Sequence, residues 1–360
     1  MRFRWASIFL TLMISLNPPL DEANAGGVAL EPEQKDRLRN TQVILLKALS
    51  LTEKGLVDPK PLFQVVSERL REVGYTVIQT VSKPHDVTLK VKCEERKTGV
   101  GITKFGGDAG RPGSPSRLWK GPACQLTYWI DSHPGPWRHE VRTDFEEAWT
   151  AAEHTHAHNS GAFALSHLYT KLEESDFHLA LAAEWEQSDR LANILISPQT
   201  DRATRLKIMS LAGHLSGPSM LEAIQQTMTD PRLTTEAILA LGRQGERGTP
   251  ILMNLVKTSQ SVEAKATAVQ ALGEIGAQNG GAQIIPHLLT MVQTPDLDLK
   301  VQTEVVKALG KMPDQRSVEP LEKLGLQAWT TRSNDPQLQK LREAVDWSLW
   351  QITPSAHTEE

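Results

Sequence analysis

A thirteen-residue stretch, residues 264–276, recurs four more times in the C-terminal half of the sequence. Its apolar residues follow one another in steps of 4, 3, 1 and 3, which places them on one face of a helix. The five aligned copies begin at Thr204, Leu233, Ala264, Val301 and Leu341. A chain with this pattern folds into a row of similar helical units.

A second apolar segment precedes each copy. These segments are residues 191–196, 220–228, 251–256, 284–292 and 318–326. Breaks at Ser197-Pro198, Asp230-Pro231, Thr294-Pro295 and Asp335-Pro336 predict a polar cap followed by a proline that starts the next helix. The unit is therefore helix, turn, helix. Spacings of 29, 31, 37 and 40 residues between copies are too irregular for a tetratricopeptide array.

Residues 188–354 resemble a HEAT-repeat domain of the short, phycobilisome-lyase-like type. The resemblance rests on the Ala-Leu-Gly triplets at 240–242, 271–273 and 308–310, and on Pro286 inside the first helix of a unit. It implies an α-solenoid of about five helical hairpins whose atypical terminal copies cap the apolar ends. Such domains serve scaffolding, binding and enzymatic proteins alike, so the fold alone leaves function open.

The first 25 residues have the features of an export signal. Arg2 and Arg4 precede an apolar run at 5–16, and Ala23-Asn24-Ala25 supplies a small-residue cleavage motif. That run is too short to span a bilayer, although an uncleaved membrane anchor is the alternative. We therefore expect a mature protein that starts at Gly26 and is periplasmic or secreted, with no stable membrane span after cleavage.

Cys93 and Cys124 are the only cysteines. In an oxidising compartment an even pair in flanking strands most simply forms a disulfide. Two free thiols or a metal-binding pair are the alternatives. Thioredoxin-like chemistry is not expected, because the Cys-x-x-Cys motif is absent.

Residues 26–187 predict a small α+β domain with helices on one face of an antiparallel sheet. Helices are expected at 33–51, 61–73 and 162–173, and strands at 75–80, 86–94, 124–131 and 137–145, the last two joined by a turn at 132–136. The glycine-rich segment 98–121 lacks the spacing of a phosphate-binding loop and is interpreted as a flexible surface loop. Residues 355–360 are expected to form a disordered tail.

Three alternating histidines, His154, His156 and His158, form the most unusual local motif. On an extended segment they would project to one side and could share a zinc, nickel or copper ion. Glu153 could supply a carboxylate to that site, and His139 and Glu140 could approach from the adjacent strand. The competing interpretation is a polar loop or helix end with exposed histidines.

Other functional classes find little support in the sequence. Among HEAT-repeat enzymes, an iron hydroxylase would need His-Glu pairs within the repeats, but the pair at 139–140 lies outside them. The usual hydrolase motifs are absent, so no catalytic residue is nominated. Nucleic-acid binding is not expected, because residues 201–360 hold 16 Lys and Arg against 18 Asp and Glu. The tryptophans Trp329, Trp347 and Trp350 are interpreted as the cap and core of the last unit.

The sequence thus favours an exported, non-catalytic scaffold or adaptor that binds protein partners in the cell envelope and needs no cofactor. The first alternative is a metal-binding protein that uses the three histidines. The second is a lyase-like accessory enzyme acting on a cofactor-bearing protein, which would need a deep pocket in the groove of the solenoid.

Overall fold

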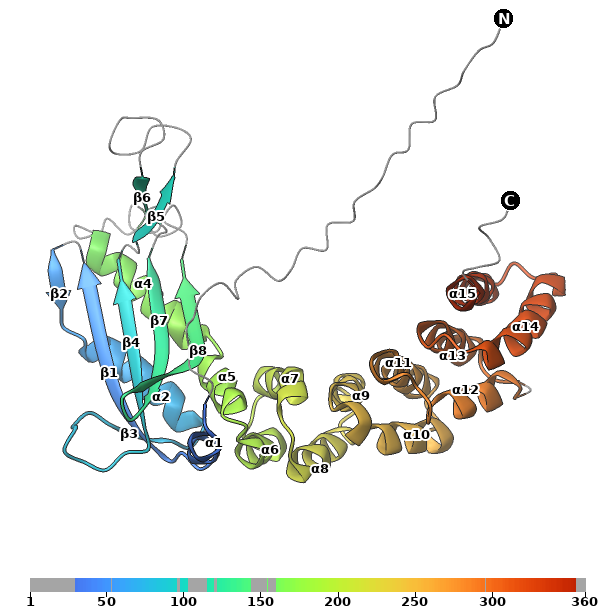
Figure 1. Ribbon diagram of the computed structural model, residues 1–360, viewed down its shortest axis with the longest axis horizontal. Coiled ribbons are helices and arrows are strands. Elements are labelled where there is room, and N and C mark those ends of the chain that lie inside the picture. The colour runs from blue at the N-terminus through green and yellow to red at the C-terminus, as the bar shows by residue number, and fades with distance from the viewer. Residues whose placement is uncertain are drawn as a thin grey trace, which may run out of the picture.

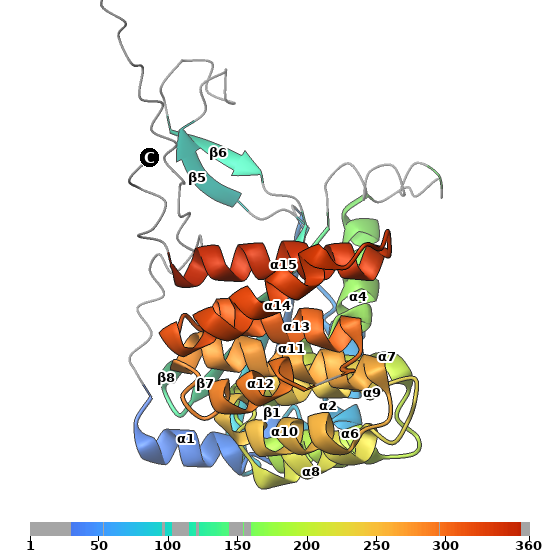
Figure 2. The same ribbon diagram turned by 90° about the vertical axis from the view of Figure 1, so that its right-hand side faces the viewer.

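The computed structural model describes residues 30–52, 54–95, 98–102, 115–119, 122–143, 154, 160–294 and 296–353. Figure 1 shows a sheet covered by helices, followed by a curved row of paired helices. Figure 2 views this row from its C-terminal end, where successive pairs stack in front of the sheet. The sequence therefore specifies an α-solenoid preceded by a small α+β domain.

The sheet of the N-terminal domain has six strands in a mixed arrangement. They are β1 (Val43–Thr52), β2 (Gly55–Val57), β3 (Thr76–Ile78), β4 (Val87–Glu94), β7 (Ala123–Ile130) and β8 (His133–Arg142), in the order β2-β1-β4-β7-β8 with β3 also paired to β1. β1 runs parallel to β3 and β4, and the other neighbours are antiparallel. The predicted all-antiparallel sheet is therefore wrong, because α2 (Lys60–Glu72) carries the chain back to the end of the sheet where β1 began.

The predicted helix at 33–51 is also wrong. Helix α1 (Pro32–Arg39) is short, and the following apolar run belongs to β1, where Ile44, Leu45 and Leu46 are all buried. A strand whose first residues are buried on both faces lacks alternation there, so its pattern resembles that of a buried helix. The remaining predicted helices correspond to α2 and to α4 (Ser160–Glu174).

Helices α2 and α4 pack on one face of the sheet (Figure 1). The alternating residues of β4 and β7 that point toward them are fully buried, among them Leu89, Val91 and Leu126. Cys93 and Cys124 lie directly opposite each other on these two strands and are joined in a disulfide. The disulfide predicted from the sequence is thus present in the structure.

Two local predictions need correction. The glycine-rich segment contains two paired strands, β5 (Thr98–Ile102) and β6 (Pro115–Trp119), where only a loop was expected. The β7–β8 connection is the two-residue turn Asp131-Ser132, and residues 133–136 already belong to β8. Asp131 adopts a positive φ of 53° there, a conformation that aspartate tolerates better than most residues.

The solenoid consists of five helical hairpins, which α5 (Phe177–Glu184) connects to the sheet domain. The hairpins are α6 (Ser188–Ile196) with α7 (Arg202–Ser210), α8 (Pro218–Thr227) with α9 (Thr234–Arg243), α10 (Thr249–Thr258) with α11 (Val262–Asn279), α12 (Ile285–Val292) with α13 (Leu299–Lys311), and α14 (Val318–Thr330) with α15 (Pro336–Ile352). Short 3₁₀ helices η1 (Ala212–His214), η2 (Gly245–Arg247) and η3 (Gln315–Ser317) join consecutive hairpins. All five predicted repeats are confirmed.

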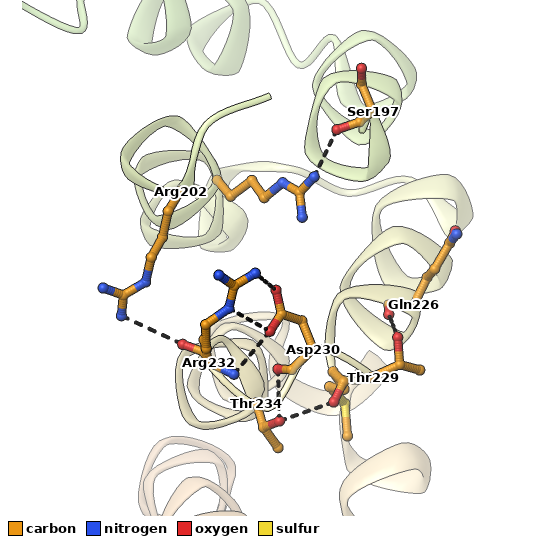
Figure 3. A network of polar contacts seen from close by, with 9 residues as sticks. Ser197, Arg202, Gln226, Thr229, Asp230, Arg232 and Thr234 are labelled. Carbon is orange, nitrogen blue, oxygen red and sulfur yellow. Dashed lines mark hydrogen bonds and ion pairs between the residues drawn. The ribbon is translucent and has the colours of Figure 1, made fainter. Parts of the chain in front are cut away.

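Proline starts the second helix of a hairpin only at Pro336, after the cap Asp335. Elsewhere the helix begins later, with Asp201 capping α7 and Asp298 capping α13. In the α8–α9 loop, Figure 3 shows the side chain of Arg232 bonded to that of Asp230 just before α9 begins. Pro286, expected inside a helix, lies in the first turn of α12. The N–H groups of a first turn have no partner within the helix, so proline costs no hydrogen bond there.

The second helices of the middle hairpins pack closely because a glycine of one faces an alanine of the next. A β-carbon on Gly273 of α11 would lie 2.8 Å from the β-carbon of Ala308 on α13. The same contact joins Gly242 to Ala271 in the preceding pair. The Ala-Leu-Gly triplet is therefore the contact between successive helices, and their close approach places them on the inner side of the curve (Figure 1).

The outer face of the last helix, α15, is partly polar. At the positions where α11 presents Val262, Ala266 and Val269 to its neighbour, α15 carries Gln339, Glu343 and Asp346. This substitution agrees with the expectation that a terminal repeat needs a polar outer face. The tryptophans are not core residues, however, since Trp329, Trp347 and Trp350 are 54%, 40% and 55% exposed.

We expect Gly273→Leu to destabilise the solenoid by about 2 kcal/mol, because the added side chain must push α13 away from α11. Leucine favours a helix more than glycine does, so overpacking has to outweigh that gain. Ala277→Leu, at an exposed site on the same helix, is the control and should be nearly neutral. Urea unfolding followed by circular dichroism measures both, and equal stability of the two variants would contradict the proposed contact.

The sheet domain and the solenoid are joined by buried polar contacts. Gln187, which directly precedes α6, donates to the carbonyl oxygens of Leu38 and Thr41 at 2.7 and 3.3 Å and accepts from the Tyr75 hydroxyl at 2.8 Å. Arg190 donates to the Thr41 oxygen at 3.0 Å and lies 4.3 Å from the centroid of the Tyr75 ring. These contacts fix the first hairpin against the sheet domain.

Candidate functional site

The inner side of the curve, formed by α7, α9, α11, α13 and α15, is the surface that the repeats present together (Figure 1). Along α11 and α13 its charges are paired. Glu263 contacts Lys300, Glu274 contacts Lys311, and Glu304 lies 2.8 Å from Lys307. We call this inner surface the groove. The three ion pairs neutralise the middle of the groove, so the sites that could bind a ligand lie at its two ends.

A cleft of about 510 Å³ lies at the C-terminal end of the groove. We call it the Trp347 cleft; it is lined by Lys307, Lys311, Lys340, Glu343, Ala344 and Trp347. The indole of Trp347 lies over Gly310, where a β-carbon would be 2.6 Å from its Cζ3 atom. Glycine at this position therefore makes room for the ring.

The Trp347 cleft combines the apolar surface of an indole with charged side chains, three lysines and Glu343. Lys307 and Lys311 already have carboxylate partners, whereas within the described part of the chain Lys340 has no ion pair. A half-exposed indole beside a free ammonium group can bind an apolar side chain next to a carboxylate.

A second cleft, of about 550 Å³, lies where the groove meets the sheet domain. We call it the junction cleft; Trp137 and Trp185 form walls, and the bidentate pair of Arg39 and Glu186 lies at its edge. Burial raises the pKa of Glu184 in this cleft, and the nearby His214 opposes that rise. A carboxyl group held closer to neutrality can donate or accept a proton, and it also makes the cleft easier to desolvate.

The three histidines of the sequence motif are not assembled by the described structure. His154 is exposed, and His156 and His158 lie outside the described residues. His139 faces the helix side of the sheet, stacked on Trp137 with 5.6 Å between ring centroids, and burial lowers its pKa. Glu140 points to the opposite face and pairs with Arg142. No group of three metal-binding side chains occurs among the described residues, and the metal site stays a prediction.

The Trp347 cleft was missed at the level of sequence, although the repeat frame contains it. Trp347 aligns with Gln270 of α11 and Lys307 of α13, positions that face the groove. The frame could have placed the tryptophan on the inner surface. The sequence contains no comparable indication of the junction cleft. Its residues come mainly from α1, β8, α5 and η1, and only the fold brings these elements together.

The fold and the groove define a helical-repeat protein with an extended inner surface. The family model for HEAT repeats matches residues 249–334. The C-terminal half of the chain therefore contains a HEAT-repeat domain, as the Ala-Leu-Gly frame indicated. No curated protein matches the chain.

A search of the described residues for a helix of the length and apolar character needed to cross a bilayer found none.

Proposed function

We propose that this protein is an exported, non-catalytic scaffold that binds a segment of another protein along the groove of its HEAT repeats. The observation that carries the proposal is the Trp347 cleft, an apolar and cationic site at the end of an otherwise charge-neutral inner surface. Extended concave surfaces of this kind are how helical solenoids bind their partners.

The contacts inside the groove favour a bound polypeptide over a small substrate. Both clefts are open, and the paired charges of α11 and α13 extend between them. A partner segment that follows the groove can place an apolar residue and a carboxylate at Trp347 and Lys340 while its backbone crosses the neutral middle. Binding energy would then concentrate at the Trp347 cleft.

Site-specific crosslinking in intact cells tests the proposal. A photoreactive amino acid at Gln270, on the inner helix α11, should capture a defined partner that mass spectrometry can identify. The same amino acid at Gln225, exposed on the outer helix α8, is the matched control. Capture of the same partners from both positions would show that the groove is not the binding surface.

We expect Trp347→Ala to weaken binding of the captured partner at least tenfold, because an indole at the centre of a contact is worth on the order of 2 kcal/mol. Lys340→Glu should weaken it further, because it reverses the charge of the one lysine of the cleft that has no ion pair within the described residues. The exposed Trp329→Ala serves as the comparison, since α14 lies on the outer side. Titration of purified partner by calorimetry gives the three dissociation constants, and equal losses for Trp347 and Trp329 would argue against the cleft.

Export is part of the same proposal. It is supported by the signal-like sequence of residues 1–25 and by the disulfide between Cys93 and Cys124, since disulfides persist in oxidising compartments. Cell fractionation with N-terminal sequencing checks it: the mature chain should start at Gly26. A full-length chain recovered from the cytosol would refute this part of the proposal and leave the groove untouched.

A further inference from the structure

The face of the sheet that α2 and α4 leave uncovered carries a row of cations. The strand registers place Lys47 of β1 opposite Lys90 of β4, Lys90 opposite Thr127 of β7, and Thr127 opposite Arg138 of β8. Lys47 and Arg138 are exposed, and Lys90 and Thr127 are half-buried. We call Lys47, Lys90 and Arg138 the cation row; it crosses the central strands at right angles and lies on the opposite side of the sheet from the disulfide.

The cation row has no neutralising partner in the described part of the chain, although other charges on the same face do. Lys92 pairs with Glu94, and Arg142 pairs with Glu140. Like charges placed directly opposite on neighbouring strands are destabilising. The pKa of Lys90 is lowered. Burial is the larger cause, and the nearby charge of Lys47 is the smaller one.

The Lys90 ammonium group is held by an aromatic ring. Its Nζ atom lies 3.4 Å from the centroid of Trp129, the neighbouring residue on β7. A cation–π contact fixes the position of the ammonium group without neutralising its charge. Lys90 is therefore a positioned positive charge in a row with two exposed cations, and an anionic ligand would relieve the repulsion between Lys47 and Lys90.

We propose that the cation row binds an acidic segment of a polypeptide. The three cations span three strand spacings of about 4.8 Å each, or about 14 Å in all. Carboxylates on alternate residues of an extended chain lie about 7 Å apart, so three of them cover nearly the same length. An extended segment with acidic residues at every second position therefore matches the length of the row, and its flexible side chains can reach the unevenly spaced cations as it lies across the strands.

The surroundings of the row favour a polypeptide over other polyanions. Past the row, Glu94 is paired with Lys92 and Glu140 with Arg142, so these pairs offer no excess positive charge to a phosphate chain that continued beyond it. Lys90 covers one face of the Trp129 ring, which removes the platform on which a nucleic-acid base would stack. A peptide can vary its charge along its length and so match both the cations and their acidic neighbours. This surface is separate from the groove and adds a second contact to the scaffold proposed above.

The test measures binding of a fluorescein-labelled peptide in which glutamate alternates with glycine, by fluorescence anisotropy on the full-length mature chain at low salt. The double variant Lys47→Gln with Arg138→Gln should weaken binding at least tenfold. Lys257→Gln with Arg332→Gln, which removes the same charge from exposed sites on the solenoid, should change it less than twofold. Circular dichroism confirms that both variants are folded.

Three results would overturn the proposal. One is an equal loss of binding in both double variants, which would mean attraction to overall charge. Another is equal affinity for a peptide with glutamine in place of glutamate. The third is tighter binding, abolished by the Lys47 and Arg138 changes, of phosphatidylglycerol vesicles or a single-stranded oligonucleotide, which would assign the row to a lipid surface or a nucleic acid. None of these results bears on the groove, since Trp347 and Lys340 are unchanged throughout.

Discussion

Replacing Gln187 by leucine is expected to lower the free energy of unfolding by about 2 kcal/mol, because leaving a buried polar group without a partner costs about 1–3 kcal/mol. The variant leaves the Tyr75 hydroxyl without its acceptor, whereas the Leu38 carbonyl oxygen keeps its bond from the Thr41 N–H. The Thr41 oxygen keeps its bond from Arg190. Burial raises the pKa of Tyr75, so its hydroxyl stays protonated and still needs an acceptor.

The matched control is Gln225→Leu, at an exposed position of α8, which should change stability by less than about 0.5 kcal/mol. Urea unfolding followed by circular dichroism compares the two. Because Gln187 ties the first hairpin to the sheet domain, small-angle scattering should also show a broader distribution of shapes for its variant. Unchanged scattering together with unchanged stability would mean that Arg190 alone fixes the joint.

The solenoid could be predicted from the sequence because the residues that pack one repeat against the next recur within each repeat. Gly242 contacts Ala271 of the next helix, and Gly273 contacts Ala308 in the same way, while Gly310 of the third triplet meets Ser348. Independent copies of one pattern reinforce one another. A single strand has no such support, so the run from Val43 to Leu49 was assigned to a helix although it forms an inner strand of the sheet.

The candidate sites were harder to predict, for two different reasons. Trp347 was interpreted as core because tryptophan is usually buried, yet its position in the frame points into the groove, where Gly310 makes room for the ring. The cation row depends on register, and a shift of β4 by one residue would move Lys90 to the other face. No local pattern reveals that Lys47, Lys90 and Arg138 lie in one line.

Removing the disulfide is expected to cost about 3 kcal/mol in the chain-entropy model for a loop of roughly 30 residues. The bridge joins Cys93 and Cys124, which are fully buried and directly opposite each other on β4 and β7. It therefore crosslinks the two central strands and closes the loop that contains β5 and β6. The variant Cys93→Ala with Cys124→Ala should unfold at a lower urea concentration than the oxidised protein.

A reductant separates this loss from the effect of the new side chains. The unfolding midpoint of the natural chain should fall toward that of the double variant when dithiothreitol is added, and the midpoint of the variant should not respond. An unchanged midpoint for the natural chain would show that the bridge contributes nothing, or that burial protects it from the reductant until unfolding. Mass spectrometry of alkylated protein at each urea concentration decides between these, because only a surviving bridge leaves both cysteines unmodified.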